Sequence, residues 1–345
     1  MRIRGMGKIR RVTRRLRNRF APGSLILLYH RVARVDSDPW LLSVTPQHFG
    51  EHLEVLRKYA RPLRLQQLNR DLEQGKRLHR RIAITFDDGY VDNLHNAKPL
   101  LERYDIPATV FVASGYVGYE HEFWWDELER LFLQPSRLPE TLRLNINGNN
   151  YQWQLGEAAY YSEDAYQRHR HWSADRQTPP TPRHSLYYAL WQLLCPMLAS
   201  DRRQVLDRLL EWAGAAPGSR PTHRSLTAAE VLALEQGELI EVGSHTVTHP
   251  FLSSLPVNLQ QQEIQQSKAR LEEILGHQVR SFAYPSGNYT LETTNIVRDA
   301  GFACACSTIP ASVRRNSDRF VLPRVEVQDW DGDEFAKRLS RWFDV

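Results

Sequence analysis

Short β-rich runs alternate with amphipathic stretches along most of this 345-residue chain, and this alternation restricts the fold more than any other feature. Helical start signals separate the runs, for example Thr45-Pro46 and the Thr227–Glu230 capping box. About seven β/α units result, which predict an α/β fold with a parallel sheet closed into a barrel or nearly so. The strand-like runs are "SLILLYH", "RIAITF", "PATVFV", "LIEVGSH", "RSFAYP", "FACAC" and "FVLPRVEV".

The alternation fails between about residues 119 and 225. Here "LRLNINGNNYQWQL" predicts a β-hairpin around an Asn-Gly turn, and residues 184–213 are expected to be helical. One apolar stripe in that helical stretch is interpreted as the core of a small subdomain rather than a ligand site. We therefore predict a mixed hairpin and helical insertion on one loop of a barrel that spans residues 25–345. The stripe consists of Tyr187, Leu190, Trp191 and Leu194.

The composition supports a globular protein from a reducing compartment. A hydrophobic fraction of 41% is enough for a proper core, which excludes a disordered or fibrous chain. Cys195, Cys304 and Cys306 are too few, and odd in number, for a disulfide framework. The last two are separated by one residue, closer than the usual metal-binding spacing, so we interpret both as small core residues.

Positive charge is concentrated in residues 1–20, which hold nine Lys or Arg and no acid. The remainder has 36 basic and 40 acidic residues, so the overall charge of +5 comes from this arm. Apolar residues recur in the arm at helical spacing, which is typical of helices that lie on anionic membranes. A solvated disordered arm or a nucleic-acid contact remains an alternative for residues 1–24. We expect peripheral membrane contact here and no nucleic-acid partner.

No apolar run after the arm is long enough for a secretory signal or a bilayer span. The run "LILL" at 25–28 is followed directly by Tyr29 and His30. We therefore expect a cytoplasmic protein, with the arm as its candidate contact with the inner membrane face.

Polar clusters follow four of the predicted strands at their carboxyl ends. Asp87 and Asp88 follow "RIAITF", His30 ends the first strand, and "YPSG" ends "RSFAYP". His245 and His249 occur in "SHTVTH" after a further strand. Because the loops after the strands build the active site of β/α barrels, these clusters are expected to lie at one edge of the sheet.

A metal site is the chemistry that this combination favours. Two histidines four residues apart can face one ion, and a carboxylate from another strand would complete three ligands with an open position. That arrangement is expected of catalytic zinc. Each motif alone is weak, since Asp88 could merely cap a helix and His245 and His249 could be ordinary loop histidines.

"TFDDGY", "SHTVTH" and "FAYPSG", in that order, resemble the polysaccharide deacetylases of carbohydrate esterase family 4, the chitooligosaccharide deacetylase-like proteins. The likeness covers residues 25–118 and 226–330. "ILLYHRV", "PATVFV" and "LPRVEV" resemble a branch involved in exopolysaccharide deacetylation. The resemblance implies a distorted (β/α) barrel of about seven units, which agrees with the number of units in the sequence.

The resemblance also implies roles for individual residues. Asp87 would be the general base, and Asp88, His245 and His249 would bind a divalent metal, expected to be Zn²⁺. The backbone N–H of Tyr284 would help to bind the oxyanion.

Two positions depart from the family pattern. Many members carry a late Leu-x-His whose histidine is the general acid, but this chain has no histidine after His277. His30 is our candidate substitute, with a rim histidine bonded to the backbone as the alternative. An arginine usually orients the base, and both Arg280 and Arg324 are candidates; for Arg324 a surface ion pair is the other interpretation.

Three further residues are candidates for a role near the site or in the fold. Trp124 and Trp125 could stack against a sugar, with Trp125 as the candidate substrate contact, or could anchor the insertion. Asp92 is expected to serve the start of the helix that follows it.

The predicted function is a metal-dependent hydrolase that removes N-acetyl groups from the amino sugars of a polysaccharide or glycolipid precursor. A metal-containing glycan-binding or assembly protein with little turnover is the alternative.

Overall fold

The computed structural model describes residues 23–343 except 77, 135 and 147, so the charged arm lies outside the described residues and its membrane contact stays a prediction. Eight strands form one sheet, with the path β13-β12-β11-β6-β5-β1-β14 and with β4 paired to β5. All of these pairs are parallel. The strands are β1 (Leu25–Tyr29), β4 (Arg61–Pro62), β5 (Arg81–Phe86), β6 (Ala108–Val112), β11 (Ile240–Ser244), β12 (Ser281–Ala283), β13 (Cys304–Cys306) and β14 (Val325–Glu326).

The two ends of this path are joined by one short segment, residues 322–326. Leu322 forms a parallel bridge with Cys306 of β13, whereas Val325 and Glu326 pair with β1. The sheet therefore curls round until its edges meet, and the predicted distorted barrel is confirmed. The distortion lies at this seam, because its pairing is much shorter than the pairing of β1 with β5.

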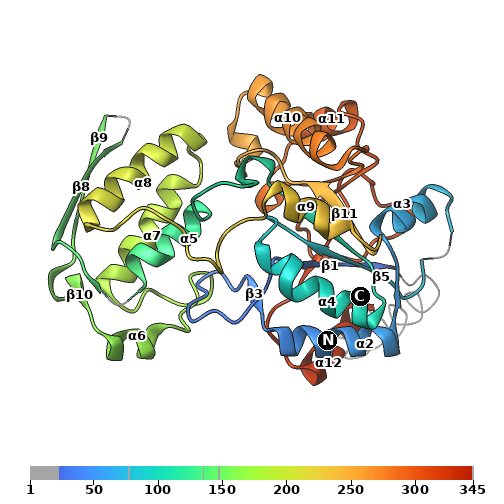
Figure 1. The fold of residues 1–345 in the computed structure, drawn as a ribbon, viewed down its shortest axis with the longest axis horizontal. Helices are drawn as coiled ribbons and strands as arrows, with labels where there is room; N and C mark the ends of the chain where they lie inside the picture. The colour runs from blue at the N-terminus through green and yellow to red at the C-terminus, as the bar shows by residue number, and fades with distance from the viewer. Residues whose placement is uncertain (1–22, 77, 135, 147, 344–345) are drawn as a thin grey trace, which may run out of the picture.

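Helices surround the sheet (Figure 1). In Figure 1, α10 and α11 lie above the strands and α2 and α12 lie below them. The helices of this part are α2 (Pro46–Tyr59), α3 (Leu65–Glu73), α4 (Lys98–Tyr104), α9 (Ala228–Glu235), α10 (Val257–Leu275), α11 (Leu291–Asp299) and α12 (Gly332–Phe343), with short turns η1 (Asn93–Ala97), η2 (Ser114–Tyr116), η4 (Leu252–Ser254) and η5 (Pro285–Gly287). Among the described residues, no helix combines the length and apolarity needed to cross a bilayer.

The sheet has a hydrophobic core on each of its two faces. Successive residues of the longer strands belong alternately to these two cores, as the two-residue period of a strand requires. On β5, Ile82, Ile84 and Phe86 belong to the larger core, which also contains apolar residues of the surrounding helices. Ala83 belongs to the smaller core, together with three leucines of α3. Cys304 and Cys306 lie in this smaller core as free thiols, so their prediction as small core residues is confirmed.

The residues between β6 and α9 fold largely into a lobe beside the barrel, drawn in green at the left of Figure 1. The predicted hairpin is present, since β8 and β9 pair antiparallel. The stretch predicted as helical forms two helices, because the helical conformation is interrupted between Leu194 and Ala199. The elements are α5 (Trp124–Phe132), β7 (Ser136–Arg137), β8 (Thr141–Ile146), β9 (Asn149–Gln154), η3 (Gly156–Ala159), β10 (Tyr160–Tyr161), α6 (Glu163–His169), α7 (Pro182–Leu194) and α8 (Ala199–Ala213).

The prediction that Asp92 caps the following helix is wrong. Its carboxylate makes no capping hydrogen bond and instead pairs with Arg31 at 3.0 Å and accepts from the amide of Val32 at 2.9 Å. Arg31 and Val32 form β2 (Arg31–Val32), which pairs in parallel with β3 (Ser43–Val44). Asp92 therefore fixes the loop after β1, because its carboxylate balances the buried charge of Arg31 and also accepts from the loop backbone.

Candidate metal and catalytic site

The turn after β5 directs two adjacent carboxylates to the carboxyl edge of the sheet. The amide of Asp87 still donates to the carbonyl of Tyr29, so this residue continues the strand. Asp88 then adopts a left-handed conformation with φ 73°, as does Gly89 with φ 82°. A β-carbon at Gly89 would lie 3.1 Å from the side chain of Val112, so a glycine is needed there.

The loop after β11 is held at both of its sides. Its amides at Val247 and Thr248 donate to the carboxylate of Glu263 on α10, both at 2.8 Å. Two backbone carbonyls of the same loop accept from amides in the loop after β6. His249 lies in the left-handed region with φ 54°, where a non-glycine residue costs energy. This rigid loop brings His245 and His249 to one side.

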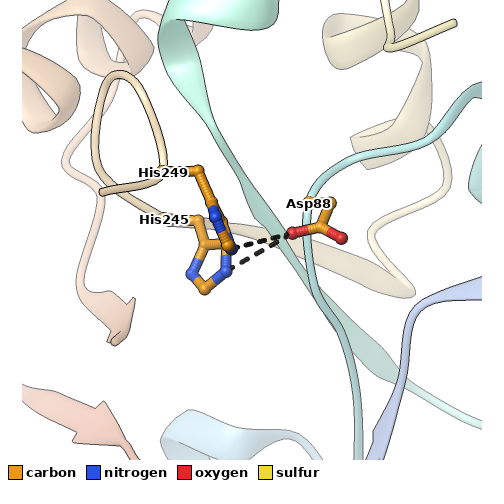
Figure 2. A group of neighbouring side chains, drawn as sticks. All are labelled: Asp88, His245 and His249. Atoms are coloured by element: carbon orange, nitrogen blue, oxygen red, sulfur yellow. Dashed lines mark ion pairs between the residues drawn. The ribbon is translucent and has the colours of Figure 1, made fainter. Parts of the chain in front are cut away.

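The Asp88 carboxylate and both imidazoles converge from these two loops (Figure 2). Asp88 Oδ1 lies 3.5 Å from His245 Nε2 and 3.4 Å from His249 Nε2. One donor atom from each of the three lies within 4.8 Å of the others. Tetrahedral zinc with bonds of about 2.0–2.1 Å holds its ligand atoms about 3.3 Å apart. The donor set and its spacing therefore fit a zinc ion.

Protonation of the three residues also fits a cation. His245 Nδ1 lies 2.8 Å from the carbonyl of Ala283, and donation there leaves Nε2 unprotonated. Burial lowers the pKa of His245 to about 4 and the pKa of His249 well below its ordinary value, so both imidazoles are neutral near pH 7. Burial and the Asp87 charge raise the pKa of Asp88. A bound cation would offset that effect and keep Asp88 ionised.

Asp87 has the opposite electrostatic environment. Arg324 pairs with it through two hydrogen bonds of 2.7 Å, one to each carboxylate oxygen. Burial alone would raise the pKa of Asp87, but Arg324 and then His245 lower it to about 2. Of the two arginines considered from the sequence, Arg324 is buried in this contact and Arg280 is exposed. Asp87 is thus held as an anion 3.9 Å from His245.

The candidate metal ligands and Asp87 line a pocket of about 330 Å³. His30 lines it together with Asp87 and the three metal-site residues, so the structure places the candidate acid at the site. Trp125 also lines it and packs edge-on against His249, with ring centroids 4.8 Å apart. The Trp125 indole N–H donates to Tyr90, which donates to Asp126. Trp125 therefore both anchors the lobe and forms a wall of the pocket.

The prediction for the Tyr284 amide needs correction. That N–H donates to the carbonyl of Cys306 at 3.1 Å, because Tyr284 continues the pairing of β12 with β13. The amide is therefore not free to bind an oxyanion. Two residues later, Ser286 lines the pocket and adopts a left-handed conformation with φ 53°. Its amide is therefore our alternative candidate for the oxyanion donor, and no sequence signal identifies it.

Sequence reasoning also missed residues that reach the pocket from outside the barrel strands. Trp40, in the loop before β3, packs against Trp191 of α7 with centroids 4.2 Å apart. Arg202 of α8 lines the same pocket. Both come from segments without a motif, so only the tertiary fold brings them to the site.

Comparisons with known proteins agree with this geometry. Residues 74–137 and 219–305 match the family model of polysaccharide deacetylases. Over 108 residues the chain is 32% identical to the poly-beta-1,6-N-acetyl-D-glucosamine N-deacetylase of Staphylococcus epidermidis, covering 28% of this chain and 37% of that protein. The chain spans less than half the length of the curated relatives that it matches first.

Solved structures share the fold. The deacetylase PplD of Streptococcus pyogenes, solved in complex with acetate, superposes with a TM-score of 0.57 at 16% identity, covering 92% of this chain and 99% of that one. IcaB from Ammonifex degensii gives a TM-score of 0.57 at 19% identity and covers 94% of this chain and 98% of its own. At such identities the likeness supports the barrel and says nothing of the substrate.

Proposed function

The chain carries a polysaccharide deacetylase domain, and we propose that it is a metal-dependent hydrolase that removes N-acetyl groups from the amino sugars of a polysaccharide or glycolipid precursor. One observation carries the proposal. Asp88, His245 and His249 form a compact donor set directly beside Asp87, a carboxylate that Arg324 keeps ionised. The pocket above gives a substrate access to both.

The residues of the chain divide the work of amide hydrolysis. Asp88, His245 and His249 would hold Zn²⁺, which when bound polarises a carbonyl and lowers the pKa of water. Asp87 accepts the proton of the attacking water, a role worth about 10²–10⁴ in rate. The Ser286 amide donates to the oxygen that becomes negatively charged, and losing such a donor typically costs roughly 3–4 kcal/mol. His30, which lines the pocket, is our candidate for protonating the leaving amine.

Substitution of the carboxylate ligand tests the proposal. We expect Asp88→Asn to lose bound zinc and acetate release from N-acetylglucosamine oligomers while it stays folded, because the amide is a poor metal ligand. Asp201→Asn, an exposed change of equal charge at the start of α8, should retain its zinc. Zinc content, acetate release and circular dichroism would be measured on each variant.

Two results would overturn the proposal. An Asp88→Asn protein that still releases acetate would remove Asp88 from the reaction. A zinc-loaded wild-type protein that releases no acetate from any N-acetylated glycan would favour a glycan-binding or assembly protein instead.

A further inference from the structure

Arg202 is a buried arginine at the wall of the metal-site pocket. It lies on α8, its relative exposure is 2%, and its guanidinium lies 5.0 Å from the centroid of the Trp124 ring. It donates from Nη2 to the carbonyl of Thr248 at 3.1 Å, and the Tyr116 hydroxyl is a second hydrogen-bond partner. The side chain also lines an adjoining cavity of about 180 Å³ on the other side. Arg202 therefore separates two hollows, one of which contains the metal-site residues.

The charges and N–H donors of the other buried arginines of the described chain are matched by more partners than those of Arg202. Two pair with carboxylates, and Arg183 donates to five backbone carbonyls and a hydroxyl. Among the described residues, Arg202 has no carboxylate within ion-pair distance, and its hydrogen-bond partners are the Thr248 carbonyl and the Tyr116 hydroxyl. The two paired arginines are Arg31 with Asp92 and Arg324 with Asp87.

A guanidinium has five N–H donors and keeps its charge inside proteins. Burial of a charge without a partner is unfavourable, and burial lowers the pKa of Arg202 accordingly. The Thr248 carbonyl and the Tyr116 hydroxyl use only part of this donor set, and no carboxylate of the described chain lies within ion-pair distance of Arg202. Because Arg202 lines both cavities, an anion there could satisfy both the charge and the geometry.

We propose that Arg202 forms an anion subsite, which binds a phosphate or carboxylate carried by the same glycan whose N-acetyl group lies at Asp88, His245 and His249. This inference rests on the proposed function. Thr248 directly precedes His249, so the carbonyl that Arg202 holds is one residue from the metal site. Trp124 beneath the guanidinium offers an apolar face to the sugar ring.

The test compares charged and neutral sugars on three zinc-loaded proteins: wild type, Arg202→Gln and the control Arg208→Gln. Arg208 is also on α8 but is exposed and donates to the carbonyl of Asn145, so this control removes the same charge. The probes are N-acetylglucosamine, its 1-phosphate and 6-phosphate, and N-acetylmuramic acid, which carries a carboxylate. Acetate release gives kcat/KM, and calorimetry gives the affinity of each sugar without turnover.

We expect at least one anionic probe to exceed the neutral sugar by about 10- to 100-fold in the wild type, the range for a hydrogen bond to a charged group. That ratio should fall to near one in Arg202→Gln and persist in Arg208→Gln. Arg202→Lys should retain part of it. The phosphate and carboxylate probes identify which anion is selected.

Other outcomes would overturn the inference. Equal loss for neutral and anionic sugars in Arg202→Gln would make Arg202 a structural clamp on Thr248, and a wild type without anion preference would exclude the subsite. The proposed function fails separately, through the absence of acetate from every probe. In that case the calorimetric ratio still decides whether Arg202 selects anions.

Discussion

Two adjacent carboxylates of the same turn have different electrostatic environments because their neighbours differ. Arg324 neutralises Asp87 through both oxygens, whereas Asp88 has only imidazoles within ion-pair distance. The pKa of Asp87 is consequently about 2, below its ordinary value, and that of Asp88 is raised. Such opposite environments separate a group that accepts protons from one that binds a cation.

The Arg324 contact predicts a pH effect. In Arg324→Gln the buried Asp87 loses its counter-charge, so its pKa should rise and the acidic limb of kcat/KM should move to higher pH. In the wild type the depressed pKa of Asp87 stabilises the fold above about pH 4, and that contribution is lost as the pH falls towards 2. We expect a loss of about 10- to 100-fold at neutral pH, typical of residues that orient catalytic groups.

Arg280→Gln is the matched control, since this exposed arginine makes no contact with Asp87. Its pH profile should match that of the wild type. A profile that shifts in both variants, or in neither, would show that Arg324 does not set the ionisation of Asp87.

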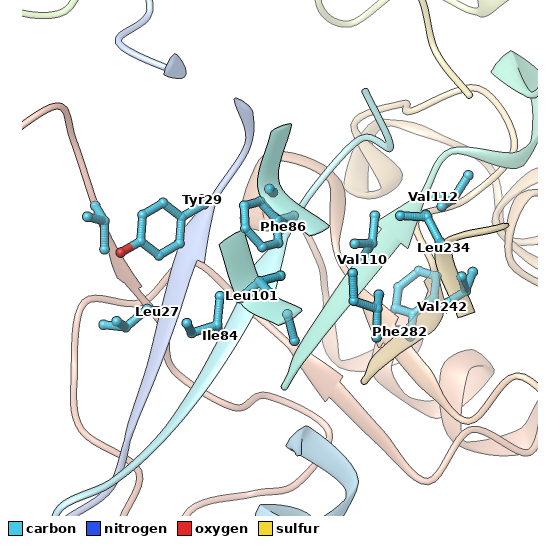
Figure 3. Packing of buried hydrophobic residues seen from close by; sticks show 14 of the residues in the cluster. Leu27, Tyr29, Ile84, Phe86, Leu101, Val110, Val112, Leu234, Val242 and Phe282 are labelled. Atoms are coloured by element: carbon cyan, nitrogen blue, oxygen red, sulfur yellow. The ribbon is translucent and has the colours of Figure 1, made fainter. Parts of the chain in front are cut away.

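At the scale of elements, the site depends on close packing between neighbouring strands (Figure 3). Figure 3 shows the larger core, with Val110 of β6 near Val242 of β11. On the opposite face of these two strands, Gly243 is paired with Phe111. The Phe111 ring lies 5.6 Å from the Arg324 guanidinium. The strand pair thus packs beside the arginine that pairs with Asp87.

Gly243→Ala should disturb this arrangement. A β-carbon there would lie 2.4 Å from the Phe111 ring, so the ring, which neighbours Arg324, must shift. We expect a destabilisation of about 1–3 kcal/mol, as is typical of overpacked cores, together with reduced acetate release. Chemical denaturation gives the first quantity. Gly50→Ala, on α2 with open space around the new β-carbon, is a control for substituting a glycine, and equal stability of Gly243→Ala and the wild type would contradict the prediction.

The strands could be predicted from the sequence because each is a short apolar run bounded by polar residues. Asp87, Asp88, His245 and His249 were identifiable because they directly follow such runs and match a family pattern. The choice between Arg280 and Arg324 could not be made, since it depends on which side chain points into the barrel.

The left-handed Ser286 and the buried Arg202 at the pocket wall have no local signature either. The first depends on one backbone angle, and the second depends on how α8 packs against the barrel. Asp92 was misassigned for a related reason, because an ion pair with Arg31, 61 residues away, replaced the local cap.

At the scale of the whole molecule, the barrel and the lobe share one pocket. The barrel supplies the metal-site residues, and the lobe supplies Trp124, Trp191 and Arg202. Arg220 joins the two ends of the lobe, since it pairs with Glu122 at 2.8 Å and with Glu129 at 2.6 Å. We therefore expect the lobe to influence which substrates enter the pocket, and the barrel to provide the residues for the proposed reaction.

Metal binding should stabilise the folded molecule as a whole. With free zinc at 100 times its dissociation constant, linkage contributes about 2.7 kcal/mol, which for a chain of 345 residues corresponds to a rise in Tm of roughly 4 °C. Thermal unfolding with zinc and after chelation measures this shift. Asp88→Asn should show none of it, and an equal shift in that variant would place the ion elsewhere.

The seam at residues 322–326 has a consequence for how the protein becomes competent. The stretch that brings the two sheet edges together also contains Arg324, which pairs with Asp87. In the order of translation, the candidate ligands leave the ribosome well before this stretch. We therefore expect a nascent chain to hydrolyse acetamides poorly until this stretch is in place, so that the proposed activity appears only when the fold is complete.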